Sequence, residues 1–209
     1  MINDHVIKTV ATYDAIATSY AVKLESFTPE QERELFLSLL KPDARILDVG
    51  CAAGRDSIFF SKKGHKTTGI DLSENLLAIA KRKAPNLKFI RGDLRDKLFK
   101  DNSFDAIWAC AVLLHLKRDE ILGVLRNFHS ILLNAGLLYI RMKEGMGEGD
   151  VFEKLSNNQI RHFTYIMPDE LQGLVEKAGF RVEKIFRRNE KDINSSLRDL
   201  WWITVIARK

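Results

Sequence analysis

Two glycines frame a turn of small residues near position 50, an arrangement that can bring a peptide backbone directly against a ligand. The turn reads Gly50-Cys51-Ala52-Ala53-Gly54 and follows the apolar run Ile46–Val49. Glycine allows an approach that a Cβ atom would block. A helix beginning just after Gly54 would present free N–H groups to a carboxylate or phosphate. The pattern therefore predicts a ligand site where a strand passes into a helix.

Carboxylates stand at the ends of three successive apolar runs. Asp48 precedes the turn, Asp71 ends the next run, and Asp93 follows the third. Asp71 comes about twenty residues beyond the turn, the position from which an acid accepts hydrogen bonds from ribose hydroxyls. Each acid alone is also typical of a helix cap or a turn. Together they indicate one binding site for a ribose-bearing ligand.

The same turn departs from the fingerprint of dinucleotide-binding folds. That fingerprint, G-x-G-x-x-G, would require glycine at positions 52 and 55 if it began at Gly50. The sequence has Ala52 and Arg55 there. Because a pyrophosphate must lie against this turn, the departures argue against an NAD-dependent dehydrogenase.

Alternating strands and helices must position these residues. Short apolar runs predict strands over Arg45–Val49, Thr67–Ile70, Leu87–Ile90, Phe104–Cys110, Leu137–Met142, Phe180–Phe186 and Ile203–Ala207. Periodic patterns predict helices over 4–24, 29–40, Asp56–Lys63, Glu74–Lys83, Arg118–Leu132 and Asp169–Ala178. This alternation implies βαβ units and a mostly parallel sheet with helices on both faces.

Composition and charge exclude several classes of protein. The 209 residues are 45% hydrophobic and 29% charged, with a net charge of +5. No run approaches the roughly 20 apolar residues of a membrane helix, and the N-terminus lacks a signal-peptide pattern, so we expect a cytoplasmic protein without membrane contact. The two cysteines and five histidines lack metal-ligand spacing, and no metal is expected. Basic runs such as Lys81–Lys83 are short and typical of solvated helix faces.

These motifs resemble those of the class I S-adenosylmethionine-dependent methyltransferases. The resemblance runs from Tyr13 to the C-terminus and rests chiefly on Asp48–Gly54 and Asp71. It implies a Rossmann-like α/β fold: a seven-stranded, mostly parallel sheet with helices on both faces and an antiparallel last strand. It also implies a single domain, 1–209, in which residues 1–43 form a helical cap over the cofactor site and residues 44–209 form the core. The implied cofactor is S-adenosylmethionine, with S-adenosylhomocysteine as its product.

The resemblance also implies roles for individual residues around the cofactor. The methionine and ribose portions would contact Gly50, Cys51, Ala52 and Gly54. Asp71 would hold both ribose hydroxyls and Asp93 the adenine amino group, while Leu72 and Leu94 pack on the adenine ring. Asp48 would organise the turn. The floor near the sulfonium would be Cys110, Ala111 and Val112.

Two features of this cofactor site have an alternative interpretation or depart from the family pattern. Tyr13 and Tyr20 resemble residues that cover the methionine end, although aromatic packing of an amphipathic helix explains them equally well. At Ala52 many family members carry a middle glycine. Because alanine adds only a methyl group, we expect the turn to tolerate it.

Residues beyond the fourth and fifth strands are candidates for the methyl acceptor. His115 follows the fourth strand and is a candidate general base, or else bonds a neighbouring loop. Arg141 and Lys143 indicate an anionic acceptor such as a carboxylate. Arg161, His162 and Tyr165 are expected to line its pocket. The glycines of Glu144–Gly149 suggest either a mobile lid or a disordered surface loop.

Direct in-line transfer to a small-molecule acceptor is the function that this pattern favours. An RNA or tRNA methyltransferase is one alternative, supported by the basic charge but not by Ala109–Val112, which lacks the Asp/Asn-Pro-Pro-aromatic motif of base methylation. A non-catalytic cofactor-binding partner protein is the other. Metal-dependent catechol-type chemistry is not favoured, because no Asp ends the fourth strand. The acceptor and the oligomeric state are not indicated by the sequence.

Overall fold

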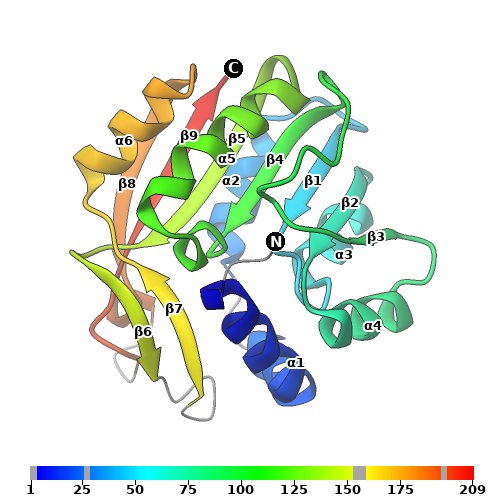
Figure 1. Cartoon of the computed structure of the whole chain (residues 1–209). Coiled ribbons are helices and arrows are strands. Elements are labelled where there is room, and N and C mark those ends of the chain that lie inside the picture. The colour runs from blue at the N-terminus through cyan, green and yellow to red at the C-terminus, as the bar shows by residue number, and fades with distance from the viewer. Residues whose placement is uncertain (1–3, 26–28, 153–158, 194–196) are drawn as a thin grey trace.

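A seven-stranded sheet forms the centre of the computed structural model, which describes residues 4–25, 29–152, 159–193 and 197–209. Its strand order is β3-β2-β1-β4-β5-β9-β8 (Figure 1). Only β9 runs antiparallel to its neighbours, β5 and β8. The predicted mostly parallel sheet with an antiparallel last strand is confirmed. The strands are β1 (Arg45–Val49), β2 (Lys66–Asp71), β3 (Lys88–Arg91), β4 (Phe104–Cys110), β5 (Leu132–Lys143), β8 (Arg181–Asn189) and β9 (Trp201–Arg208).

Helices cover both faces of this sheet, as expected for βαβ units. α5 and α6 pack on one face through apolar side chains such as Phe128 and Val175. On the other face, Phe36 of α2 and Phe60 of α3 pack against Trp108, whose ring stacks on Tyr139 at 3.8 Å. The helices are α1 (Asp4–Glu25), α2 (Glu30–Ser38), α3 (Arg55–Lys62), α4 (Glu74–Lys83), α5 (Arg118–Ile131), α6 (Pro168–Lys177), α7 (Glu190–Ile193) and the short 3₁₀ helix η1 (Leu113–His115).

The two helices of the N-terminal region take different positions. α1 lies at the carboxyl ends of the central strands, beside β7 (Figure 1). α2 instead packs on the sheet, where Phe36 is fully buried. The expectation that all of residues 1–43 cap the cofactor site is therefore wrong for α2, because its apolar stripe is needed to close the core over β1 and β4.

A hairpin replaces the loop that the glycines near position 147 suggested. β6 (Glu148–Phe152) pairs antiparallel with β7 (Ile160–Thr164). Gly145 and Gly147 have positive φ and form the turn before β6, whereas Gly149 lies within it. α1 anchors the hairpin, because the Thr12 hydroxyl donates to the Ile160 carbonyl at 2.6 Å. In the described residues this segment is neither a lid loop nor a disordered surface loop.

Candidate functional site

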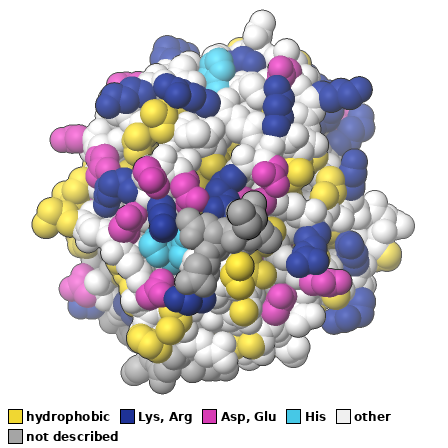
Figure 2. All heavy atoms as spheres, viewed as in Figure 1, with side chains coloured by type: hydrophobic (Ala, Val, Ile, Leu, Met, Phe, Trp, Pro, Cys, Tyr) yellow, Lys and Arg dark blue, Asp and Glu magenta, His cyan; other side chains and the backbone are white. Residues whose placement is uncertain are grey.

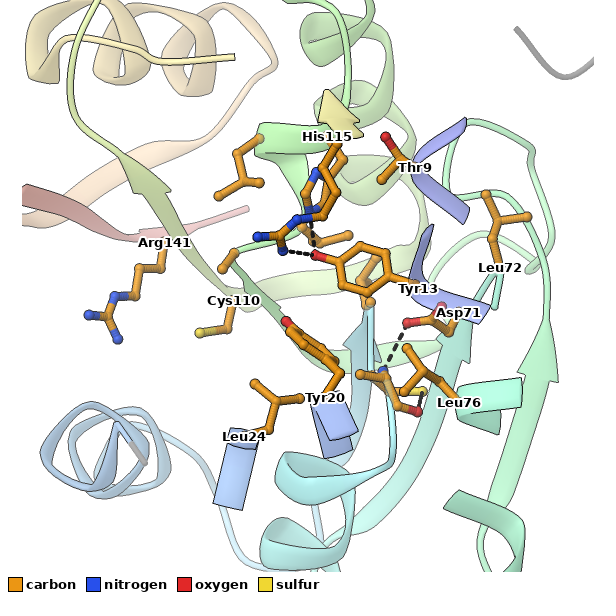
Figure 3. Close-up of a pocket in the computed structure, with 18 of the residues that line it drawn as sticks. Thr9, Tyr13, Tyr20, Leu24, Asp71, Leu72, Leu76, Cys110, His115 and Arg141 are labelled. Carbon is orange, nitrogen blue, oxygen red and sulfur yellow. Dashed lines mark hydrogen bonds between the residues drawn. The ribbon is translucent and has the colours of Figure 1, made fainter. Parts of the chain in front are cut away.

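A cavity of about 650 Å³ opens at the carboxyl edge of the sheet, beneath α1. The register of the central strands explains its position: Val49 pairs with Ile70, and Asp48 pairs with Trp108, so β1, β2 and β4 end close together. Crevices outside the carboxyl ends of parallel strands are the usual ligand sites in open α/β sheets. Figure 3 shows side chains from α1, from the strand ends and from the segment after β4 gathered around this space.

The turn after β1 lines the cavity and needs glycine at position 50 because the Val112 side chain packs against it. Gly50 has φ +70°, and a Cβ atom there would lie 2.5 Å from Cγ2 of Val112. Ala52 also has positive φ, at 48°. A left-handed conformation costs an alanine about 1–2 kcal/mol, which explains why a middle glycine suits this turn. The cost of alanine at position 52 therefore lies in its backbone conformation rather than in the size of its methyl group.

Gly54 does not line the cavity, although it was predicted to contact the cofactor. It is the N-cap of α3 with φ +79°. A Cβ atom there would lie 2.9 Å from the Phe89 ring and 3.0 Å from the Ala80 methyl group. Gly54 is therefore needed for the turn into α3 and for the close packing of that turn against α4 and β3.

The Asp71 carboxylate closes the turn from the end of β2. Its two oxygens accept hydrogen bonds from the backbone N–H groups of Ala52 and Ser73, each at 2.8 Å (Figure 3). Burial raises the pKa of Asp71, and these two N–H groups oppose that rise. Each oxygen keeps a further lone pair, so the carboxylate can still accept from a ligand hydroxyl.

Asp93 lines the cavity, but its carboxylate is already paired with the Arg95 guanidinium. Nε of Arg95 lies 2.9 Å from Oδ1 and 3.1 Å from Oδ2 of Asp93. Burial acts to raise the pKa of Asp93, yet the hydrogen bonds from Arg95 prevail and lower it. The same guanidinium reaches Glu120 at 2.8 Å. The sequence placed Asp93 at the correct edge but did not predict this pairing, so its contact with adenine stays a prediction.

A buried cluster of polar groups supports the turn from behind. Asp48 accepts a 2.6 Å hydrogen bond from the Ser57 hydroxyl, and burial together with the nearby Asp56 carboxylate raises the pKa of Asp48 to about 8. Asp56 is held by Arg55 at 2.8 Å and by Arg33 at 3.3 Å. Arg55 also donates to the Leu24 carbonyl at 3.0 Å, which ties α1 to α3. No sequence motif marks this cluster.

His115 is joined to α1 and to the hairpin by a chain of hydrogen bonds. Its Nδ1 lies 2.8 Å from the His162 carbonyl, which can only accept, so Nδ1 carries the proton. The Tyr13 hydroxyl lies 2.9 Å from Nε2, and Arg161 donates to that hydroxyl at 2.8 Å. Because Arg161 occupies the oxygen as a donor, the hydroxyl proton points at Nε2. Burial, then the Arg161 charge, lower the pKa of His115 to about 3.

Most of the predicted site residues share the one cavity. Tyr13 and Tyr20 lie edge to face with ring centroids 4.9 Å apart, next to Asp71 on one side and Cys110 and Arg141 on the other in the view of Figure 3. The structure also brings to this cavity Asp48, Gly50, Cys51, Ala52, Leu72, Asp93, Leu94, Ala111, Val112, His115, Lys143 and Arg161.

Tyr165 and His162, by contrast, do not line the cavity. Tyr165 follows β7, where its N–H donates to the Gly147 carbonyl at 3.0 Å and its own carbonyl accepts from Arg118 at 2.6 Å. The His162 ring is buried against His5, with centroids 4.7 Å apart. Alternation along β7 explains the position of His162, because Arg161 and Phe163 share the face that meets the cavity. Tyr165 lies beyond the last residue of β7, so this alternation does not extend to it.

Several lining residues escaped the sequence argument. They come from the end of α1, from β7, from the segment between β8 and β9, and from the start of β9: Leu24, Phe163, Glu190, Leu197, Arg198 and Trp202. In the sequence, only Tyr13 and Tyr20 of the first helix indicated that this side of the cavity exists. In the described ranges, no group of His, Cys, Asp and Glu has a metal-binding arrangement, and no helix meets the length and hydropathy of a membrane span.

Comparison with known proteins places this geometry in a family. A methyltransferase domain model matches residues 46–136. A putative methyltransferase, YqeM, of Bacillus subtilis is 30% identical over 146 residues, which cover 67% of this chain and 59% of YqeM. The demethylmenaquinone methyltransferase of Chlorobaculum tepidum is 30% identical over 139 residues, 66% of this chain and 54% of the relative. The chain thus matches between half and two thirds of each relative's length.

Solved structures share the fold. An S-adenosylmethionine-dependent methyltransferase from Methanosarcina mazei aligns with a TM-score of 0.74 at 18% identity, over 84% of this chain and 96% of that one. A second structure is a 1,6-didemethyltoxoflavin-N1-methyltransferase from Burkholderia thailandensis with bound 1,6-didemethyltoxoflavin and S-adenosylhomocysteine. It aligns with a TM-score of 0.73 at 22% identity, over 100% of this chain and 91% of that one. Residues 46–136 thus match a methyltransferase domain, and the chain has the fold of the solved S-adenosylmethionine-dependent methyltransferases.

Proposed function

We propose that the protein transfers a methyl group from S-adenosylmethionine directly to a small-molecule acceptor. The observation that carries the proposal is the shared cavity: the Gly50 turn and the Asp71 carboxylate face one half of it, and Tyr13, linked to His115, faces the other. The [4+2]-cyclase SpnF has the same fold, with a TM-score of 0.68 at 19% identity over 86% of this chain and 80% of that one. Because one fold can serve different reactions, the proposed activity rests on the site.

The residues at the turn fit the adenosyl group of this cofactor. Asp71 keeps acceptor lone pairs that ribose hydroxyls can use, and Gly50 lines the same cavity with its backbone, packed against Val112 where a side chain would not fit. Nothing at the turn supplies the third glycine that a pyrophosphate requires, because position 55 is an arginine engaged with Asp56. When bound, S-adenosylmethionine supplies an electrophilic methyl group on its sulfonium.

The chain's own residues then orient the acceptor and remove its proton. Enclosure between α1 and the strand ends supports an in-line approach by restricting the orientation of the acceptor. The Tyr13 hydroxyl stands at the wall of the acceptor half, and His115 behind it is neutral with a free lone pair on Nε2 that receives the hydroxyl proton. A proton leaving the acceptor can pass to the Tyr13 oxygen as that oxygen's own proton moves to Nε2.

A small acceptor suits this cavity better than a nucleic acid does. α1 lies at the carboxyl edge of the sheet and lines the cavity, so it covers part of the side on which a polymer would have to bind. On the face shown in Figure 2, the described Lys and Arg side chains are interspersed with Asp and Glu rather than gathered in a stripe. The curated relatives include enzymes named for demethylmenaquinone, phosphoethanolamine and sterol substrates.

The test is a screen for S-adenosylhomocysteine release from S-adenosylmethionine by the full chain. The panel contains small acids, amines, phenols and thiols, with bulk RNA as a separate arm. Release with a small molecule and none with RNA supports the proposal. Release with RNA alone would replace the proposal with the nucleic-acid alternative, and tight cofactor binding without release in any arm would favour a non-catalytic partner protein.

A further inference from the structure

Three cationic side chains face the acceptor half of the cavity. Arg141 and Lys143 are two residues apart on β5 and so project from the same face of that strand. Arg161 comes from β7 and donates to the Tyr13 hydroxyl, which places its charge beside the proposed proton path. Lys143 and Arg161 are each only 3% exposed. Figure 3 shows Arg141 on the opposite side of this space from Asp71.

Aromatic rings hold all three cations. Cζ of Arg141 lies 4.7 Å from the Trp202 ring centroid, and Nζ of Lys143 lies 3.6 Å from that of Phe163. Cζ of Arg161 lies 5.0 Å from the same Phe163 ring. Such contacts fix the charged groups and exclude water from one side of each.

Glu190, a carboxylate that lines the same cavity, is already engaged. Glu190 accepts from Arg198 at 2.7 and 3.0 Å and from the Trp202 indole N–H at 3.0 Å. Arg141 has a different environment: its Nε atom is buried and, within the described residues, has no hydrogen-bond partner. A buried donor of this kind is costly unless a ligand completes it.

We propose, on the basis of the methyltransferase function above, that the acceptor carries an oxyanion, a carboxylate or a phosphate, which the Arg141 guanidinium binds. Arginine suits this task because its planar fork matches two oxygens at once. Lys143 and Arg161 contribute favourable charge from the adjoining wall. This arrangement would orient the acceptor, with its charged end toward Trp202 and its nucleophile toward Tyr13.

The positive field also has an effect on the proton path. Burial and then the Arg161 charge lower the pKa of His115, and the Lys143 charge acts in the same direction. These cations therefore keep the imidazole neutral, and they oppose its protonation until an anion offsets part of their charge. An anionic acceptor would be attracted by the same charges, because a cleft lined by one sign of charge concentrates ligands of the opposite sign.

Calorimetry on the full chain saturated with S-adenosylhomocysteine tests the inference with matched probes. Benzoate and benzamide have the same shape and differ in charge, and phenyl phosphate separates the two oxyanions. We expect benzoate or phenyl phosphate to bind about tenfold or more tightly than benzamide. Arg141→Gln should abolish that preference, whereas Arg181→Gln, at an exposed arginine of β8, should keep it.

The outcomes separate this inference from the proposed function. Equal affinities for benzoate, phenyl phosphate and benzamide in the wild type would overturn the oxyanion site, and this comparison needs no variant. An unchanged preference in Arg141→Gln would overturn the assignment to Arg141. Failure of the wild type to bind S-adenosylhomocysteine at all would instead overturn the methyltransferase proposal.

Discussion

The Tyr13 hydroxyl lies 2.9 Å from Nε2 of His115, so the first helix and the segment after β4 meet inside the cavity. The His162 carbonyl fixes the tautomer of His115, and the Arg161 guanidinium fixes the direction of the Tyr13 proton. Four groups from three separate parts of the chain thus define one direction of proton movement, from Tyr13 to His115.

This relationship predicts that Tyr13→Phe will slow methyl transfer. With an acceptor from the screen that must lose a proton, we expect kcat to fall by roughly 100-fold, since general base catalysis contributes about that much or more. S-adenosylhomocysteine affinity should change by much less, because the ring that packs on Tyr20 is retained. Steady-state kinetics and calorimetry measure the two effects separately.

Tyr165→Phe is the matched control, since it deletes the same atom at a residue outside the cavity. It should leave kcat near the wild-type value. If the two variants lose activity equally, or if neither loses any, Tyr13 has no role in proton transfer.

A second prediction concerns stability at acidic pH. The pKa of His115 is about 3 in the folded protein and near 6.5 in an unfolded chain, so the unfolded state takes up a proton first as the pH falls. The free energy of unfolding of the wild type should therefore decrease, relative to that of His115→Gln, as the pH drops from about 6.5 toward 3. At pH 5.5 this relative loss amounts to about 1.4 kcal/mol.

Urea unfolding at a series of pH values measures this difference. The contribution is absent above pH 7, where both states hold a neutral imidazole. Curves for the two proteins that stay parallel between pH 7 and pH 4 would show that His115 is not buried in its neutral form.

A third prediction follows from the positive φ of Ala52. Ala52→Gly removes the strain of an alanine in the left-handed conformation, which costs about 1–2 kcal/mol. The glycine adds about 0.5–1 kcal/mol of backbone entropy cost on folding. The net expectation is a gain of roughly 0.5–1 kcal/mol in the free energy of unfolding. Ala53→Gly, one residue on, adds the entropy cost without that relief and should destabilise the protein. Destabilisation of comparable size in both variants would show that Ala52 is unstrained.

Local patterns in the sequence account for the sheet and for the cofactor half of the site. Strand runs and helix periods are properties of neighbouring residues, and the acids Asp48, Asp71 and Asp93 all follow such runs, so their common edge could be predicted. The Arg95 fork on Asp93 could not be predicted, because it depends on side-chain geometry that spacing does not encode.

The residues on the acceptor side of the cavity, such as Phe163 and Trp202, could not be predicted from the sequence for another reason. They come from α1, β7, the segment before β9 and the start of β9, which meet only after the sheet has formed. β6 and β7 are short and pair only with each other, so neither shows the long apolar run of a core strand. The sequence therefore predicted a glycine-rich loop where the structure has a hairpin. It also predicted that Tyr165 lines the cavity, whereas Arg161 and Phe163 of β7 do so and Tyr165 does not.

Titration of the full chain with S-adenosylhomocysteine tests the central claim most directly, because the claim is that the Gly50 turn and Asp71 form one adenosyl site. We expect saturable binding to the wild type and to Asp169→Asn, a control at an exposed carboxylate. Asp71→Asn should lose at least about tenfold in affinity, since its amide puts a donor where both oxygens now accept from N–H groups. No binding to the wild type, or equal affinity in all three proteins, would contradict the account.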